Sequence, residues 1–198
     1  GLIALASDFM IEKDFAKVLK DKKIDIFVNR IDSYNPLTKE NLIKMSDKVT
    51  EVTKNILPNE EIDCIIYGCT SGTIAAGFNF IEKKVKDAKP NAKLTTPSSA
   101  AIKAFRKFDV KRLSIFTPYS KKLNDEIVGF FSNEGFDIKS NNYLDIAADY
   151  DIGKVDQEFL YNIISQIDMN DTDALFISCT ALPVLNIIDR LEKKLLKP

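Results

Sequence analysis

Apolar runs of strand length alternate with longer stretches of helical periodicity along the whole chain. The pattern predicts strands at residues 2–6, 24–28, 64–67, 93–96, 113–117, 136–139 and 174–177. It predicts helices at residues 12–19, 38–56, 72–86, 98–108, 121–133, 155–166 and 182–194, and Thr38 and Ser98 suit helix N-cap positions. Strands that alternate with helices indicate βα units, and therefore an α/β fold with mostly parallel sheets flanked by helices.

The second half of the chain repeats the first. Three pairs of segments match in the same order, each pair about 110 residues apart: 2–8 with 113–119, 65–70 with 175–180, and 81–85 with 191–195. We therefore expect two similar α/β lobes, residues 1–96 and 97–198, related by a pseudo-twofold axis, with the active site in the cleft between them. The counterparts of 93–96 and 98–108 would lie beyond Pro198, so either the C-terminus is truncated or the second lobe lacks its last strand and helix.

Composition narrows the chemistry that this chain can perform. The sequence contains no histidine, which excludes Ser-His and Cys-His catalytic pairs and histidine-ligated metal sites. The 28 basic and 29 acidic residues leave a net charge of −1, so a nucleic-acid partner is not expected. Acid/base chemistry must therefore come from Cys, Asp, Glu, Lys or Tyr.

The cysteine count and the start of the chain bear on its location. Three widely spaced cysteines do not form a disulfide framework. The opening apolar run, residues 1–6, is too short for a signal peptide or a membrane span, although the starting methionine is absent. We expect a cytoplasmic protein with reduced thiols and no membrane partner.

Cys69 and Cys179 occupy equivalent places in the repeat, each at the end of a predicted strand and each followed by threonine. Ligands of parallel sheets bind at the carboxyl ends of the strands, and a following helix N-terminus lowers a thiol pKa and attracts anions. The residues after the cysteines offer hydroxyls and backbone N–H groups to a small carboxylate: Thr70, Ser71, Gly72, Thr180 and Ala181. We interpret Cys69 and Cys179 as paired catalytic thiols; Cys64, within an apolar run, is read as a core residue.

Other candidates carry weaker signals. Asp8 and Tyr119 end the first strand of each lobe and point toward the same cleft. Tyr119 can hydrogen-bond a substrate carboxylate, whereas Asp8 can act on the substrate or cap the following turn; we place both among the substrate-binding residues. Asn35 belongs to a turn, although its amide can reach the cleft. Asp149 and Asp151 are read as solvated acids of a loop.

The motifs Gly68-Cys-Thr-Ser-Gly72 and Ser178-Cys-Thr-Ala-Leu-Pro183, with Thr117-Pro-Tyr119 between them, resemble the aspartate/glutamate racemase superfamily. They are most similar to its branch of maleate cis-trans isomerases, arylmalonate decarboxylases and the ectoine-utilisation protein A group. The resemblance implies a cofactor-independent isomerase or racemase, without a metal, that acts on a small carboxylate or amino-acid-like substrate through its cysteine pair. It also implies a homo-oligomer, a dimer or larger.

Two departures discriminate within that branch. The decarboxylases keep only the second cysteine, so the pair argues against them. Residues 2–9 resemble the ectoine-utilisation group, and Asp8 stands where maleate isomerases generally have an asparagine that binds a carboxylate. An ionised aspartate there repels a carboxylate, and a substrate with an amino or amidine cation is better matched.

Two rival functions use the same residues. A small-carboxylate-binding protein without catalytic activity would use the same cleft, and a redox sensor would form a disulfide between Cys69 and Cys179. Fast alkylation of the thiols at neutral pH is expected only of an enzyme.

Overall fold

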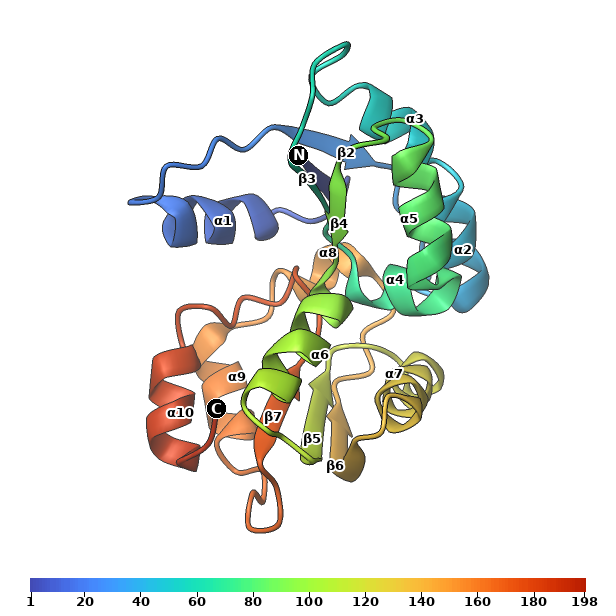
Figure 1. The fold of residues 1–198 in the computed structure, drawn as a ribbon. Helices are drawn as coiled ribbons and strands as arrows, with labels where there is room; N and C mark the ends of the chain where they lie inside the picture. Colours follow the sequence, from blue (N-terminus) through green and yellow to red (C-terminus); the bar gives the residue numbers. More distant parts are fainter.

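The computed structural model describes all 198 residues and contains two parallel β-sheets, one from each half of the chain (Figure 1). The first sheet has the strand order β2-β1-β3-β4, with β1 (Leu2–Leu5), β2 (Val28–Ile31), β3 (Cys64–Tyr67) and β4 (Lys93–Thr95). The second has the order β6-β5-β7, with β5 (Arg112–Thr117), β6 (Asp137–Tyr143) and β7 (Ala174–Ile177). In each sheet the first strand along the chain lies between the second and third. The predicted α/β fold with two parallel sheets is confirmed.

The first sheet is covered by helices on both faces. The helix α1 (Ile11–Leu19) lies on one face, and the others lie on the opposite face (Figure 1): α2 (Lys39–Ser46), α3 (Val49–Lys54), α4 (Thr70–Ala76) and α5 (Phe78–Lys86). Because side chains alternate along a strand, Leu2 and Ala4 pack with Ile11, whereas Ile3 and Leu5 belong to the main core.

Helix α6 (Pro97–Lys107) follows a strand of the first sheet but packs against the second. The Phe105 ring makes edge contacts with Phe131, Phe136 and Phe176, at centroid distances of 6.1, 5.5 and 6.0 Å. The remaining helices are α7 (Lys121–Asn133), α8 (Asp149–Ile152), α9 (Gln157–Ile164) and α10 (Ile188–Leu195). We call the first sheet with α1–α5 the first lobe and the second sheet with α6–α10 the second lobe. The division of the chain into two domains, residues 1–96 and 97–198, stays a prediction.

Several helices differ from the predicted ones. The predicted helix 38–56 is two helices, α2 and α3, and 72–86 is interrupted at Gly77, whose φ of 88° is a left-handed conformation that glycine adopts readily. Thr38 is confirmed as an N-cap, since its hydroxyl accepts from the Asn41 N–H at 3.2 Å. Ser98 is not one: Thr96 caps α6 because proline occupies the first helical turn. None of the helices is long and apolar enough to cross a membrane.

The predicted strand 24–28 lies four residues too early. The observed β2 begins at Val28, and the apolar Ile24 is 58% exposed instead of buried in a sheet. Polar side chains hold β2 in place: Asn29 donates to the Val52 carbonyl at 3.0 Å, and Arg30 donates to the Leu5 carbonyl at 2.9 Å. These tertiary contacts are not visible in an apolar pattern.

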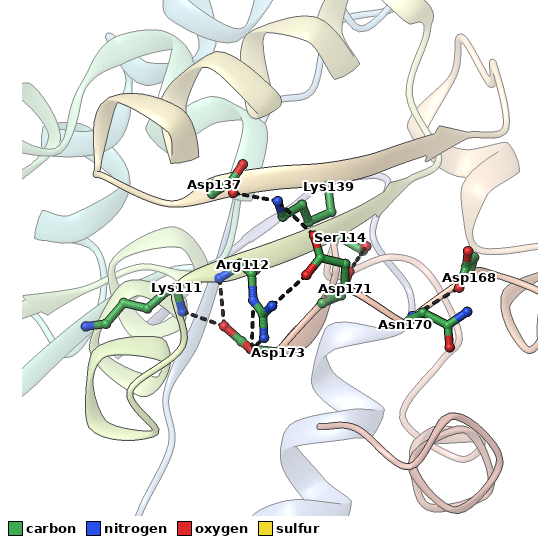
Figure 2. Close-up of polar contacts among 10 residues, drawn as sticks. Lys111, Arg112, Ser114, Asp137, Lys139, Asp168, Asn170, Asp171 and Asp173 are labelled. Carbon is green, nitrogen blue, oxygen red and sulfur yellow. Dashed lines mark hydrogen bonds and ion pairs between the residues drawn. The ribbon is translucent and has the colours of Figure 1, made fainter.

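An ionic network lies at the amino ends of the second sheet, where β5 and β7 begin (Figure 2). The Arg112 guanidinium donates to Asp173 Oδ1 from two nitrogens, at 3.2 and 2.6 Å, and to Asp171 at 2.6 Å. Lys139 pairs with Asp171 at 3.0 Å and with Asp137 at 2.8 Å. The network ties three neighbouring strands at the ends opposite the cysteine of β7.

Candidate active site

Cys69 lies between β3 and α4 and caps the helix with its sulfur. The Sγ atom accepts from the Gly72 N–H at 3.2 Å, and Ser71 Oγ lies 3.8 Å from it. A side chain at position 72 would force its neighbours to move, since its Cβ would lie 2.9 Å from Cys69 Sγ and 2.8 Å from the Tyr67 hydroxyl. Glycine at position 72 therefore lets the backbone of α4 approach the buried Cys69 sulfur closely.

Cys179 follows β7 with a left-handed backbone, φ 87°. A non-glycine residue in this region is strained by about 1–3 kcal/mol, and such strain clusters at functional sites. The residue is half-buried, and the nearby Ala181 N–H and Tyr119 hydroxyl favour the thiolate and so oppose the rise in its pKa. The helix predicted from residue 182 is wrong here, because a turn follows Cys179 and α10 begins only at Ile188.

Tyr119 lies close to both cysteines. Its side chain is buried, and its hydroxyl accepts from Ser178 Oγ at 3.3 Å. Burial, and then the neighbouring Cys179 and Cys69, raise the pKa of Tyr119 well above its ordinary value. The phenol therefore stays protonated and can donate to the Cys179 sulfur.

Asp8 is 1% exposed and links the two lobes. Its Oδ1 accepts from the Met10 and Ile11 N–H groups, at 2.8 and 2.9 Å, which fixes the start of α1. Its Oδ2 accepts from Thr180 Oγ1 at 2.9 Å, and the same hydroxyl lies 3.0 Å from the Gly68 carbonyl oxygen. Asp8 thus caps a turn of the first lobe and is also hydrogen-bonded to the loop that follows Cys179 in the second lobe.

The other predicted substrate-binding residues, Thr70, Ser71 and Ala181, are buried next to the cysteines in the chain. The Thr70 hydroxyl makes no hydrogen bond within the protein. Their contacts with a substrate stay predictions. No group of three or more His, Cys, Asp or Glu side chains is arranged to hold a metal ion.

Asp149 is the site residue that the sequence analysis missed. The sequence predicts a solvated acid of a loop at this position, but Asp149 begins the short helix α8 between the lobes and is 4% exposed. Its Oδ2 accepts from Ser7 Oγ at 2.6 Å, and its N–H donates to Asn35 Oδ1 at 3.2 Å. The Asn35 amide does reach the junction of the lobes. The burial of Asp149 depends on these contacts with the first lobe, which no local pattern indicates.

The pKa of each thiol is raised, not lowered as the helix N-terminus predicted. Burial, the largest cause, raises the pKa of Cys69 to about 12, although the Gly72 N–H and Ser71 oppose it. Burial and then Asp149 raise the pKa of Cys179 well above its ordinary value. In both cases the carboxylates of Asp149 and Asp8 contribute, so burial and like charge outweigh the N–H donors.

Comparison with known proteins decides the family. The arylmalonate decarboxylase family model matches residues 26–198. The chain belongs to the arylmalonate decarboxylase family. This membership confirms the branch that the two cysteine motifs indicated.

The chain is also similar to several maleate isomerases. The chain is 22% identical over 209 residues to the maleate isomerase of Geobacillus stearothermophilus, covering 98% of this chain and 83% of the relative. It is 25% identical over 150 residues to that of Pseudomonas putida, covering 72% of this chain and 60% of the relative. For the relatives from Pseudomonas putida, Nocardia farcinica and Alcaligenes faecalis, the match spans less than two thirds of the relative's length.

Solved structures share the fold over the whole chain. A Nocardia farcinica maleate cis-trans isomerase, a cysteine-to-serine mutant with a covalently bound succinylcysteine intermediate, matches with a TM-score of 0.92 at 20% identity. The Pseudomonas putida S16 maleate isomerase with maleate matches with a TM-score of 0.88 at 24% identity. Each match covers 100% of this chain and 84% of the other. These likenesses establish the two-lobed α/β fold.

Proposed function

We propose that this chain is a cofactor-independent isomerase that acts on a small carboxylate, with Cys69 and Cys179 as its catalytic residues. The observation that carries the proposal is that both thiols share the same buried neighbours. Asp8 and Asp149 raise the pKa of both thiols, and the two cysteines in turn raise the pKa of Tyr119. Two thiols that come from separate lobes and share these neighbours can act on opposite faces of a substrate.

The relatives support this reaction class. Four maleate isomerases match the chain, and the succinylcysteine in the Nocardia farcinica structure is a covalent adduct of a cysteine of that protein. The cysteine pair and the family membership together favour cis-trans isomerisation through covalent addition.

In the covalent route, one thiolate gives its electron pair to one carbon of a double bond conjugated to a carboxylate, and a C–S bond forms. The electrons of the double bond move to the neighbouring carbon, which takes a proton from the opposite thiol. The new single bond rotates. Return of the proton to that sulfur and expulsion of the thiolate restore the double bond in the other geometry.

The racemase route uses the same groups. One thiolate removes the proton next to the carboxylate, and the opposite thiol delivers a proton to the other face. Both routes need one ionised and one protonated thiol, and ionisation of the first opposes ionisation of the second. The Gly72 N–H at Cys69 and the Tyr119 hydroxyl at Cys179 are the donors that stabilise a thiolate.

Incubation in deuterium oxide with maleate, a panel of other small carboxylates and cyclic amino acids tests the function. Proton NMR would show isomerisation without exchange at the α-carbon for covalent addition, and exchange at the α-carbon for proton abstraction. If compounds of the panel bind to the protein but are neither converted nor exchanged at the α-carbon, the result would support the alternative, a small-carboxylate-binding protein.

Further features of the protein are proposed with this function. Residues 2–9 and Asp8 favour the ectoine-utilisation group as a second candidate for the substrate class. We also expect a cytoplasmic enzyme that forms a homo-oligomer. Light scattering of the purified chain measures the oligomeric state, and a monomer would contradict that expectation.

A further inference from the structure

Two buried carboxylates from opposite lobes flank the cysteines. Asp8 follows β1 in the first lobe, and Asp149 begins α8 in the second. Neither takes part in an ion pair. Arg30 donates to the backbone carbonyl of Asp8, not to its carboxylate, and is paired with Glu12. The site therefore lacks a positive partner for these carboxylates. Burial of charge without a counter-charge is costly.

The two carboxylates differ in what they have left to offer a ligand. Asp8 uses both oxygens, with two backbone N–H groups on Oδ1 and Thr180 on Oδ2. Asp149 uses only Oδ2, which accepts from Ser7, while its Oδ1 accepts no hydrogen bond in the protein. No side-chain oxygen of the protein is both fully buried and unpartnered, so this Oδ1 keeps some exposure and can accept from a molecule bound near the two thiols.

Contacts with the first lobe hold Asp149 in position. The neighbouring Tyr150 ring meets Phe9 edge-on, with centroids 5.4 Å apart. Phe9 also covers Gly153, where a Cβ would lie 2.7 Å from the ring. The Asn35 amide oxygen accepts from the Asp149 N–H at 3.2 Å. The carboxylate is therefore preorganised before a ligand arrives.

We infer that Asp149, together with Asp8, binds a positively charged group of the substrate, a protonated amine or amidine, beside the two thiols. This inference rests on the proposed function of the same site and narrows its substrate class. A dicarboxylate would add negative charges to a site that already holds two. In a substrate with both a carboxylate and a cationic group, the cationic group donates to Asp149 Oδ1. Its carboxylate can then bind to backbone N–H groups.

The arrangement also couples substrate binding to thiol ionisation. Without a ligand, the charges of Asp149 and Asp8 favour the protonated thiols, in agreement with the raised pKa of Cys69 and Cys179. A bound cation offsets those charges and favours the thiolate. The reactive form then arises when the correct substrate is present.

The charge preference of the site can be measured without turnover. Cationic 2-(trimethylammonium)ethyl and anionic 2-sulfonatoethyl methanethiosulfonate react with a thiolate to form a mixed disulfide and release methanesulfinate. Labelling at each cysteine is followed by peptide mass spectrometry in the wild type, in Asp149→Asn and in the control Asp151→Asn. Asp151 is an exposed residue of the same helix. Cys64, which lies elsewhere at the start of β3, is the internal reference.

We expect the cationic reagent to be favoured at Cys69 and Cys179, and that preference, relative to Cys64, to fall about tenfold in Asp149→Asn but not in Asp151→Asn. An unchanged ratio, or no labelling by the cationic reagent, would overturn the inference. A second readout is calorimetric binding of matched ligands, alanine against propionate and aspartate against succinate. Tighter binding of propionate and succinate by the wild type would also overturn it.

These readouts separate the two proposals. Neither requires the protein to be an isomerase. An active enzyme whose preference for the cationic reagent is absent in the wild type, or unchanged in Asp149→Asn, rejects the role of Asp149 alone. Inactivity towards every substrate, with the expected preference and its fall in Asp149→Asn both observed, rejects the proposed function alone.

Discussion

The Thr180 hydroxyl donates to Asp8 Oδ2 at 2.9 Å and thereby joins the loop of one cysteine to the strand end of the other lobe. Thr180 directly follows Cys179, and the same hydroxyl lies 3.0 Å from the carbonyl of Gly68, which directly precedes Cys69. One side chain therefore sets the position of both thiol loops relative to each other.

Replacing Thr180 with valine removes this hydroxyl and keeps the shape of the side chain. A buried carboxylate oxygen then loses its donor, so we expect the free energy of unfolding to fall by about 1–3 kcal/mol. Urea denaturation of Thr180→Val measures the loss, and Thr180→Ser, which keeps the hydroxyl, is the matched control. Equal midpoints for the valine and serine variants would contradict this role.

Gly72→Ala introduces a Cβ within 2.9 Å of Cys69 Sγ and 2.8 Å of the Tyr67 hydroxyl. Because the sulfur has to move, we expect activity to fall at least about tenfold and stability to fall by about 1–3 kcal/mol. Gly129→Ala in α7 is the control, since nothing lies within 4 Å of its Cβ, and alanine in a helix is neutral to stabilising. Similar behaviour of the two variants would argue against the close packing around the thiol.

Asp149→Asn should make the thiols of the free protein more acidic. A nearby carboxylate charge raises the pKa of Cys69, about 12, and of Cys179, so its removal lowers both. At a fixed pH below these pKa values, the thiolate fraction and the rate of alkylation by neutral iodoacetamide therefore rise. The pH profile of alkylation is expected to shift to lower pH in Asp149→Asn and to stay unchanged in Asp151→Asn; a shift to higher pH would refute the assignment.

The ionic network at the amino ends of the second sheet predicts a stability that depends on pH. The Arg112 guanidinium and the N–H groups of Arg112 and Lys111 hold the pKa of Asp173 well below its usual range. A depressed folded-state pKa contributes stability above the ordinary aspartate pKa, and this stability is lost as the pH falls toward the folded-state value. Asp173→Asn should thus lower the melting temperature at pH 7 more than at pH 3.

Asp125→Asn tests whether this effect is specific to the network. Asp125 makes only an exposed pair with Lys121 on α7, and such pairs contribute little. A similar loss in both variants, or a loss at Asp173 that is independent of pH, would contradict the network's contribution.

The alternation of apolar runs and helical stretches was sufficient to predict the two parallel sheets. It was also sufficient to place Cys69, Cys179, Asp8 and Tyr119 at strand ends, because the strands that precede them coincide with local apolar runs. It was not sufficient for Asp149. Asp149 and Asp151 lie two residues apart in similar surroundings, and only contacts with Ser7 and Asn35 of the other lobe bury the first of them.

The errors in element bounds have the same origin. Ile24 begins an apolar run that the pattern assigned to a strand, but the pairing partner of β1 starts at Val28. The raised pKa of each thiol also escaped a local argument, since it comes from burial between the lobes and from carboxylates distant in the chain.

The central claim is that Cys69 and Cys179 act as a catalytic pair. The most direct test compares kcat/KM of Cys69→Ser, Cys179→Ser and the control Cys64→Ser on the substrate that the panel identifies, with melting temperatures recorded for each. We predict that the first two variants lose about 10²–10⁴-fold in kcat/KM at an unchanged melting temperature, whereas Cys64→Ser keeps its activity. Full activity in either Cys69→Ser or Cys179→Ser would contradict the pair.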